Sequence, residues 1–221
     1  MRDIFHDELD DIGKRVIEMT HLVAVAMERG TQALLDANLA LADQVIANDR
    51  RIDALREDLE DRTFQLIAQQ QPVATDLRVL ISTIHLAADL ERMGDLAHHV
   101  AKIARLRYPE VAVPPEARDI ISQMGEVAGS LVEKVADVVD GRDIALAQAI
   151  EQEDDSMDAL RRKLFTVVLS PHWSRGTEAA IDMTLLGRYY ERYADHAVAV
   201  ARHTIFIVTG KRPHGSDTAL T

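Results

Sequence analysis

The sequence predicts an all-α protein made of two tandem three-helix bundles with six long helices. Three observations support this prediction. Aromatic residues make up only 4% of the 221 residues while apolar residues make up 47%, a composition that favours long helices over sheets. Apolar residues recur in alternating steps of three and four, as in bundle helices. Short motifs of the first half also recur in the second half, which is the mark of an internal repeat.

The first half contains three predicted helices. The first covers residues 3–37, because apolar residues from Ile12 to Ala33 follow the helical spacing. Asn38 is a stop signal, and a second apolar stripe ends near residue 70. Pro72 marks the turn before a third helix. The stripe of this third helix consists of Leu77, Leu80, Ile84 and Ala88.

The second half repeats this plan after a break in the pattern. Three prolines between residues 108 and 115 predict a linker. A fourth helix then ends at Gly141, a fifth begins near Asp143, and a sixth reaches Gly210 after a turn at residues 170–176. We therefore expect repeats at residues 1–108 and 116–212, a linker at 109–115 and a disordered tail at 213–221.

Charge and composition exclude several classes of function. The net charge of -12 opposes binding to nucleic acid or to an anionic membrane surface. The absence of cysteine excludes disulfides, thiolate metal sites and thiol catalysis. The acidic N-terminus does not resemble a signal peptide, and no apolar run approaches the roughly 18 residues that span a bilayer. We expect a cytoplasmic protein without membrane insertion.

Four carboxylate pairs accompany the repeat. Each consists of two acidic residues four positions apart, so both side chains of a pair lie on one helix face and can reach one cation. The second and third predicted helices carry one pair each, and so do the fifth and sixth. The candidate metal ligands are Asp49, Asp53, Glu91, Asp95, Asp154, Asp158, Glu191 and Asp195.

The positions of these pairs predict two clusters. Glu91 and Asp95 continue the predicted core-facing stripe of their helix, and the pairs of the second and fifth helices lie at the borders of theirs. Packing the helices together would gather four carboxylates, which repel one another by about 4 kcal/mol per close pair at an effective dielectric constant of 20. Oxygen ligands favour magnesium, manganese, calcium or iron as the compensating ion.

Salt bridges are the alternative to metal. Arg50, Arg92 or Arg192 could neutralise the carboxylates, although the last two directly follow their glutamates and are expected to point about 100° away along the helix. His98 and His99 follow Asp95 by three and four positions and offer a nitrogen ligand. The simpler interpretation is a partly exposed histidine pair near a helix end.

Several motifs together resemble the PhoU family, the accessory regulators of bacterial high-affinity phosphate transport. They read QPVATDLR at 71–78, DLERMGD at 89–95, YERYADHA at 190–197 and VTG at 208–210. The resemblance implies two three-helix bundles related by a pseudo-twofold axis and metal ions, iron among them, bound by the eight carboxylates. It implies a negative regulator and not an enzyme, one that couples the ATPase of the phosphate ABC transporter to a membrane sensor histidine kinase. It also allows a homodimer.

The two halves differ beside their motifs. Asp89 and His99 in the first half correspond to Tyr189 and Ala199 in the second. An additional carboxylate near an ion typically changes metal affinity by about 10- to 100-fold. We therefore expect the first metal site to be the tighter one.

Two other functions stay open from the residues alone. A ferritin-like carboxylate-bridged iron enzyme needs a Glu-x-x-His step on each of two helices, and this chain offers only Glu18 to His21, outside both clusters. The other is a helical scaffold without metal, in which the carboxylates form ordinary salt bridges.

Overall fold

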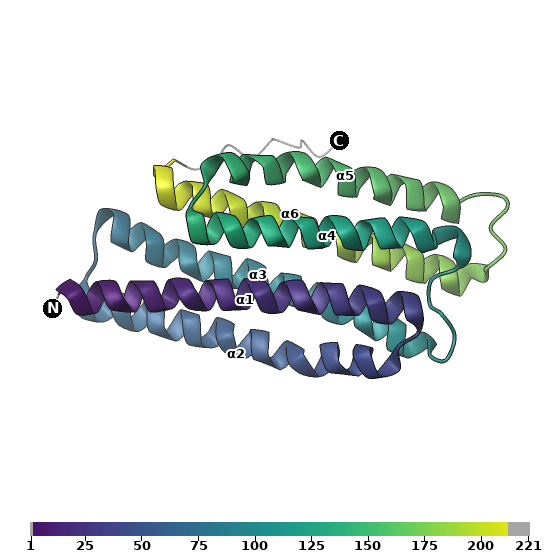
Figure 1. The fold of residues 1–221 in the computed structure, drawn as a ribbon, viewed down its shortest axis with the longest axis horizontal. Coiled ribbons are helices and arrows are strands. Elements are labelled where there is room, and N and C mark those ends of the chain that lie inside the picture. The colour runs from purple at the N-terminus through teal and green to yellow at the C-terminus, as the bar shows by residue number, and fades with distance from the viewer. Residues whose placement is uncertain (1, 212–221) are drawn as a thin grey trace.

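The computed structural model describes residues 2–211, and this range contains six α-helices and no strand. The helices are long and nearly parallel or antiparallel to one another (Figure 1). The prediction of an all-α fold with six long helices is confirmed. The bounds are Arg2–Asp36 for α1, Leu39–Gln70 for α2, Ala74–Arg107 for α3, Pro115–Gly141 for α4, Ile144–Val168 for α5 and Gly176–Thr209 for α6.

The chain reverses direction through short capped connections. Asn38, expected as the stop of the first helix, instead caps the start of α2, where its side-chain oxygen accepts a hydrogen bond from the Leu41 N–H at 3.1 Å. Asp143 caps α5 in the same way through the N–H groups of Ala145 and Leu146. The predicted linker connects α3 to α4, and the tail at 213–221 lies outside the described residues.

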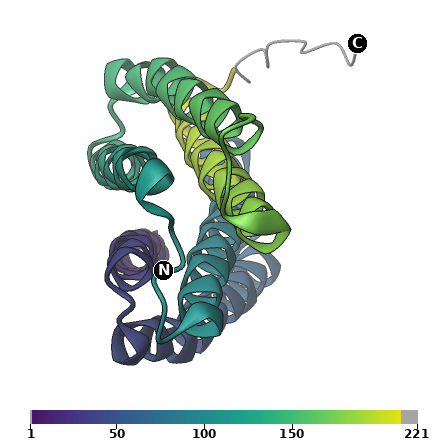
Figure 2. The same cartoon turned by 90° about the vertical axis from the view of Figure 1, so that its right-hand side faces the viewer.

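Each half forms its own three-helix bundle. Helices α1, α2 and α3 pack on one another, and so do α4, α5 and α6. The two bundles lie side by side, joined by contacts of α1 with α4 and of α3 with α6 (Figure 2). No helix in the described range has an apolar stretch long enough to cross a bilayer.

The buried face of α3 differs from its predicted stripe. Leu77 is 36% exposed and Ile84 and Ala88 are only half-buried, whereas Leu80 and Leu90 are fully buried. The prediction was right for Leu80 and wrong for the other three residues, because α3 packs against α1, α2 and α6 at once. Its buried positions therefore lie around much of the helix, and a single stripe does not describe them.

The interface between the bundles contains a buried polar contact. The hydroxyl groups of Tyr190 and Thr31 lie 2.7 Å apart, and Thr31 also donates to the Met27 carbonyl at 2.9 Å. Because Thr31 already donates its hydroxyl hydrogen to Met27, the Tyr190 hydroxyl is the donor to Thr31. Both side chains are buried, so the Tyr190 hydroxyl has lost its contact with water. Helices α1 and α4 also approach closely beside this contact, since a Cβ on Gly125 of α4 would lie 2.6 Å from Thr31 Cγ2 on α1. This contact is one of those that join the second bundle to the first.

We predict that Thr31→Val destabilises the protein more than Tyr190→Phe does. The first substitution leaves a buried hydroxyl donor without a partner, which costs about 1–3 kcal/mol of unfolding free energy. The second leaves only the Thr31 oxygen without a donor, and the Thr31 hydroxyl still donates to the Met27 carbonyl. The double variant should cost less than the sum of the two. Urea unfolding measures all three, with Tyr189→Phe at a half-buried position as the control. Strictly additive losses would show that the two hydroxyls are not coupled.

Candidate metal centres

The first cluster of carboxylates lies where α2 packs on α3. Burial is the main cause of the raised pKa of Asp53, and the charges of Asp49 and Asp95 add to it. Burial likewise raises the pKa of Glu91, with further contributions from Asp95 and Asp53. Like charges repel one another, so each neighbouring carboxylate adds to the shift. The two pairs therefore lie close enough on α2 and α3 for their charges to interact.

A glycine in the motif allows this approach of the two helices. A Cβ on Gly94 would lie 2.9 Å from Ile52 Cδ1 and 3.7 Å from Asp49 Oδ1. A larger residue at this position would require the Ile52 side chain to move. Gly94 belongs to the DLERMGD motif, and its position between Glu91 and Asp95 was the available signal in the sequence.

The second cluster has the same composition between α5 and α6. The pKa of Asp154 is raised to about 6, mainly by burial and then by the charges of Asp195 and Asp158. Burial also raises the pKa of Asp195, with Glu191 as the next cause. The pair Asp154 and Asp158 thus lies close enough to the pair Glu191 and Asp195 for their charges to interact, and the role of these residues as metal ligands stays a prediction.

Arginine side chains reach both clusters. Arg92 places Nη1 2.9 Å from Asp95 Oδ2 and Nε 3.6 Å from Glu91 Oε2. In the second cluster, Arg161 and Arg188 hold the two oxygens of Glu191 at 3.0 and 2.5 Å. The expectation that Arg92 points away from its neighbours was wrong, because a long flexible side chain can fold back over one helical turn. Arg188 lies one turn before Glu191 on α6, and Arg161 lies on the neighbouring helix α5. Neither contact was predicted from the sequence.

These arginines do not neutralise the clusters. Arg92 is 60% exposed, so water screens its attraction for the two carboxylates. The pKa values of Asp53, Glu91, Asp154 and Asp195 all remain raised in their presence. For these four carboxylates, burial together with the smaller effect of repulsion therefore outweighs the attraction of the arginines.

The donor set fits a hard cation. Every predicted ligand is a carboxylate, the type of donor that magnesium, calcium, manganese and iron accept. Within residues 2–211, no three histidine or acidic side chains are already arranged as a complete ligand set. The carboxylates would have to turn away from their arginine partners to converge on an ion.

His98 belongs to the first cluster as a support for a carboxylate. Its Nδ1 contacts Asp49 Oδ2 directly, and its Nε2 is buried without a hydrogen-bond partner. This contact orients Asp49 and fixes which imidazole nitrogen carries the interaction. His98 therefore lies behind one of the predicted ligands.

His99 turns towards the other bundle. Its ring stacks on Tyr189 of α6 with centroids 5.2 Å apart and planes 20° apart. Burial lowers its pKa, and the charges of Lys102 and His98 act in the same direction. His99 is thus part of the interface between the bundles.

Asp89 also lies at this interface. Its two carboxylate oxygens face His196 Nδ1 at 2.9 Å and His203 Nε2 at 3.4 Å, both on α6. Burial alone would raise the pKa of Asp89, but the hydrogen bonds and charges of the two histidines outweigh it and lower the pKa. The reason for expecting a tighter first site is therefore removed, because both additional residues serve the contact between α3 and α6.

Comparison with known proteins matches this arrangement of two equivalent halves. The family model for the PhoU domain matches the chain twice, at residues 16–104 and 121–204. The chain is 49% identical over 213 residues to the "Phosphate-specific transport system accessory protein PhoU homolog 2" of Mycobacterium tuberculosis, covering 96% of this chain and all of that protein. It is 36% identical to the PhoU homologue of Aquifex aeolicus, covering 92% of each chain.

Solved structures agree with the fold. The crystal structure of PhoU from Pseudomonas aeruginosa superposes with a TM-score of 0.86 at 29% identity, covering 94% of this chain and 100% of that one. The phosphate transport system regulatory protein PhoU from Streptococcus pneumoniae has a TM-score of 0.85 at 23% identity, covering 95% and 99%. Two family matches, near-complete relatives and the shared fold lead to one conclusion: the chain belongs to the PhoU family.

Proposed function

We propose that this protein is a negative regulator of the phosphate-starvation response and a modulator of high-affinity phosphate uptake. It acts in the cytoplasm as a metal-binding adaptor between the ATPase of the phosphate ABC transporter and a membrane sensor histidine kinase. The observation that carries this proposal is the double PhoU match, together with relatives described as accessory proteins of phosphate-specific transport. As a PhoU protein it is an accessory and regulatory protein and not an enzyme.

The adaptor role needs a folded surface that can respond to conditions. In each bundle the carboxylate cluster bridges two helices, α2 with α3 and α5 with α6. A bound cation would supply the positive charge that the clusters lack. Asp53 and Glu91 would then hold α2 to α3, and Arg92 would be released towards solvent. The exposed surface of both bundles would change with the occupancy of the clusters.

The metal-free scaffold is the second candidate, since ion pairs already reach both clusters from Arg92, Arg161 and Arg188. The ferritin-like enzyme has less support. Glu18, its proposed ligand on α1, instead pairs with Arg51 at 2.6 Å. Membership of the PhoU family also favours a regulatory protein over an enzyme.

Loss of the gene should leave phosphate-starvation genes expressed in phosphate-rich medium. A negative regulator that is missing can no longer silence them. Transcript levels in a deletion strain measure this. Two homologues occur together in Mycobacterium tuberculosis, so any second homologue in the host must be deleted as well. Normal silencing in a strain free of suppressors and of other homologues would contradict the regulatory role.

Asp154→Asn tests whether the charge of the second cluster destabilises the metal-free protein and is compensated by a bound cation. The raised pKa of Asp154, about 6 against 3.8 for a free carboxyl, means that the folded state binds more protons than the unfolded state between these pH values. The group therefore destabilises the metal-free protein progressively as pH rises from 4 to 7. We expect the variant to melt about 2–4 °C higher than the wild type at pH 7 and equally at pH 4.

With saturating Mn²⁺ at pH 7, the wild type should instead melt at a higher temperature than Asp154→Asn, because the amide is a poorer ligand than the carboxylate. The matched control is Asp137→Asn, which removes the same charge from an exposed position of α4 outside both clusters and should change neither comparison. A metal-free variant less stable than the wild type at pH 7 would instead support the salt-bridged scaffold.

A further inference from the structure

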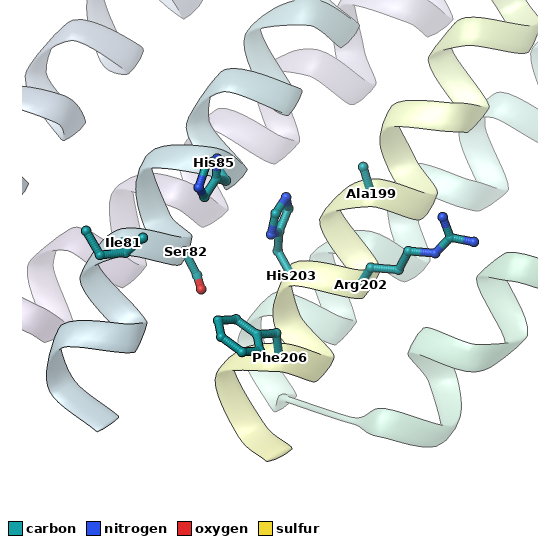
Figure 3. A pocket seen from close by; sticks show the side chains of 7 residues that line it. All are labelled: Ile81, Ser82, His85, Ala199, Arg202, His203 and Phe206. Carbon is teal, nitrogen blue, oxygen red and sulfur yellow. The ribbon is translucent and has the colours of Figure 1, made fainter. Parts of the chain in front are cut away.

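A cavity of about 320 Å³ opens between α3 and α6, at the seam of the two bundles. Figure 3 shows Ile81, Ser82 and His85 on α3 facing His203 and Phe206 on α6. This size lies at the lower end of the range for small-molecule sites. Such sites are mainly apolar with a few polar groups that orient the ligand, and this cavity has that composition.

The polar groups that line the cavity favour an anion. They are the imidazoles of His85 and His203, the guanidinium of Arg202 and the hydroxyl of Ser82, and no acidic residue is among the lining residues. This is notable in a chain where acidic residues outnumber basic ones by 37 to 25. Glu151 holds Arg202 through Nε at 2.6 Å. Figure 3 shows the Arg202 side chain extending from α6 away from His85 and Phe206, so its guanidinium lies at the edge of the cavity. Its terminal amino groups take no part in the contact with Glu151 and can donate to a ligand at that edge.

The flat groups around the cavity favour a planar ligand. The rings of His85 and His203 are stacked with centroids 5.1 Å apart and planes only 6° apart. Asp89 holds His203 through Nε2, so this ring has a fixed orientation. The Phe206 ring also lines the cavity, and the Arg78 guanidinium lies 6.0 Å from the centroid of this ring. Aromatic ligands bind well against such planar and cationic surfaces.

The other end of the seam cannot form the same site. The repeated motifs are offset by 100 residues, which places Leu185 and Ile103 where the cavity has His85 and His203. In place of Ser82 stands Asp182, which is buried and pairs with Arg107 at 2.6 Å. The cavity is therefore a feature of one end of the seam, with one copy in each chain.

We propose that this cavity is a binding site for a small planar aromatic anion, whose ring packs against Phe206 and the imidazoles while its negative group meets Arg202. A ligand there would contact both bundles at once. It would also lie beside the contacts of Asp89 with His196 and His203, which join α3 to α6. Binding would thus stabilise one arrangement of the two halves.

The test uses the fluorescent aromatic sulfonate 8-anilinonaphthalene-1-sulfonate on the metal-free full chain. We expect one site per chain, and at least tenfold weaker binding of N-phenyl-1-naphthylamine, which has the same rings without the sulfonate. Equal affinity for both probes would overturn the assignment of an anion site. No saturable binding of the sulfonate would overturn the site altogether. This comparison needs no variant and therefore does not depend on one that folds.

Variants then locate the site. Arg202→Gln should weaken the sulfonate about tenfold through the loss of a charge-assisted hydrogen bond. The matched control is Lys102→Gln at the exposed equivalent position of the first repeat, which should have no effect. Ala199→Leu should fill the cavity and weaken both probes at least tenfold with unchanged helicity. Equal losses in Arg202→Gln and Lys102→Gln, or unchanged binding in a folded Ala199→Leu protein, would overturn the proposed location.

Discussion

The constraint that shapes both clusters is the burial of carboxylates between packed helices, which raises the pKa values of Asp53, Glu91, Asp154 and Asp195 more than their mutual repulsion does. The apolar contacts of α2 with α3 and of α5 with α6 leave each cluster little room to spread, and Gly94 makes the first contact especially close. The raised pKa of Asp154, about 6, reports the energetic cost of this arrangement. Such clusters occur in both halves, at positions that the internal repeat makes equivalent.

The contact between α3 and α6 ties the two bundles together by a different kind of interaction. Asp89 faces two histidines across the seam, and His99 stacks on Tyr189. These polar and aromatic groups lie within one or two turns of the cluster residues on the same helices. Helix α3 packs on both α2 and α6, and helix α6 packs on both α5 and α3. A structural change in either cluster can therefore reach the contact between α3 and α6 along these helices.

The fold could be predicted from the sequence because long helices with helical apolar spacing and clear turn residues leave few alternatives. The repeat also placed the four acidic pairs at equivalent positions of the two halves, and their role as metal ligands stays a prediction. The contacts of the side chains could not be predicted from the sequence. Arg92 folds back on Asp95, and Asp89 faces α6, because rotamers and the packing of the two bundles decide these contacts. Spacing along one helix contains no information on a helix 100 residues away.

Metal content tests the central claim most directly. Protein purified without chelator or a nickel column should contain metal by elemental analysis. Replacing the carboxylates of one cluster with amides should remove about half of that metal while helicity is unchanged, since each bundle has its own cluster. The substitutions for the first cluster are Asp49→Asn, Asp53→Asn, Glu91→Gln and Asp95→Asn. Wild-type protein without metal, which also fails to bind added Mn²⁺, Mg²⁺ or Fe²⁺, would contradict the proposal that these clusters are metal centres.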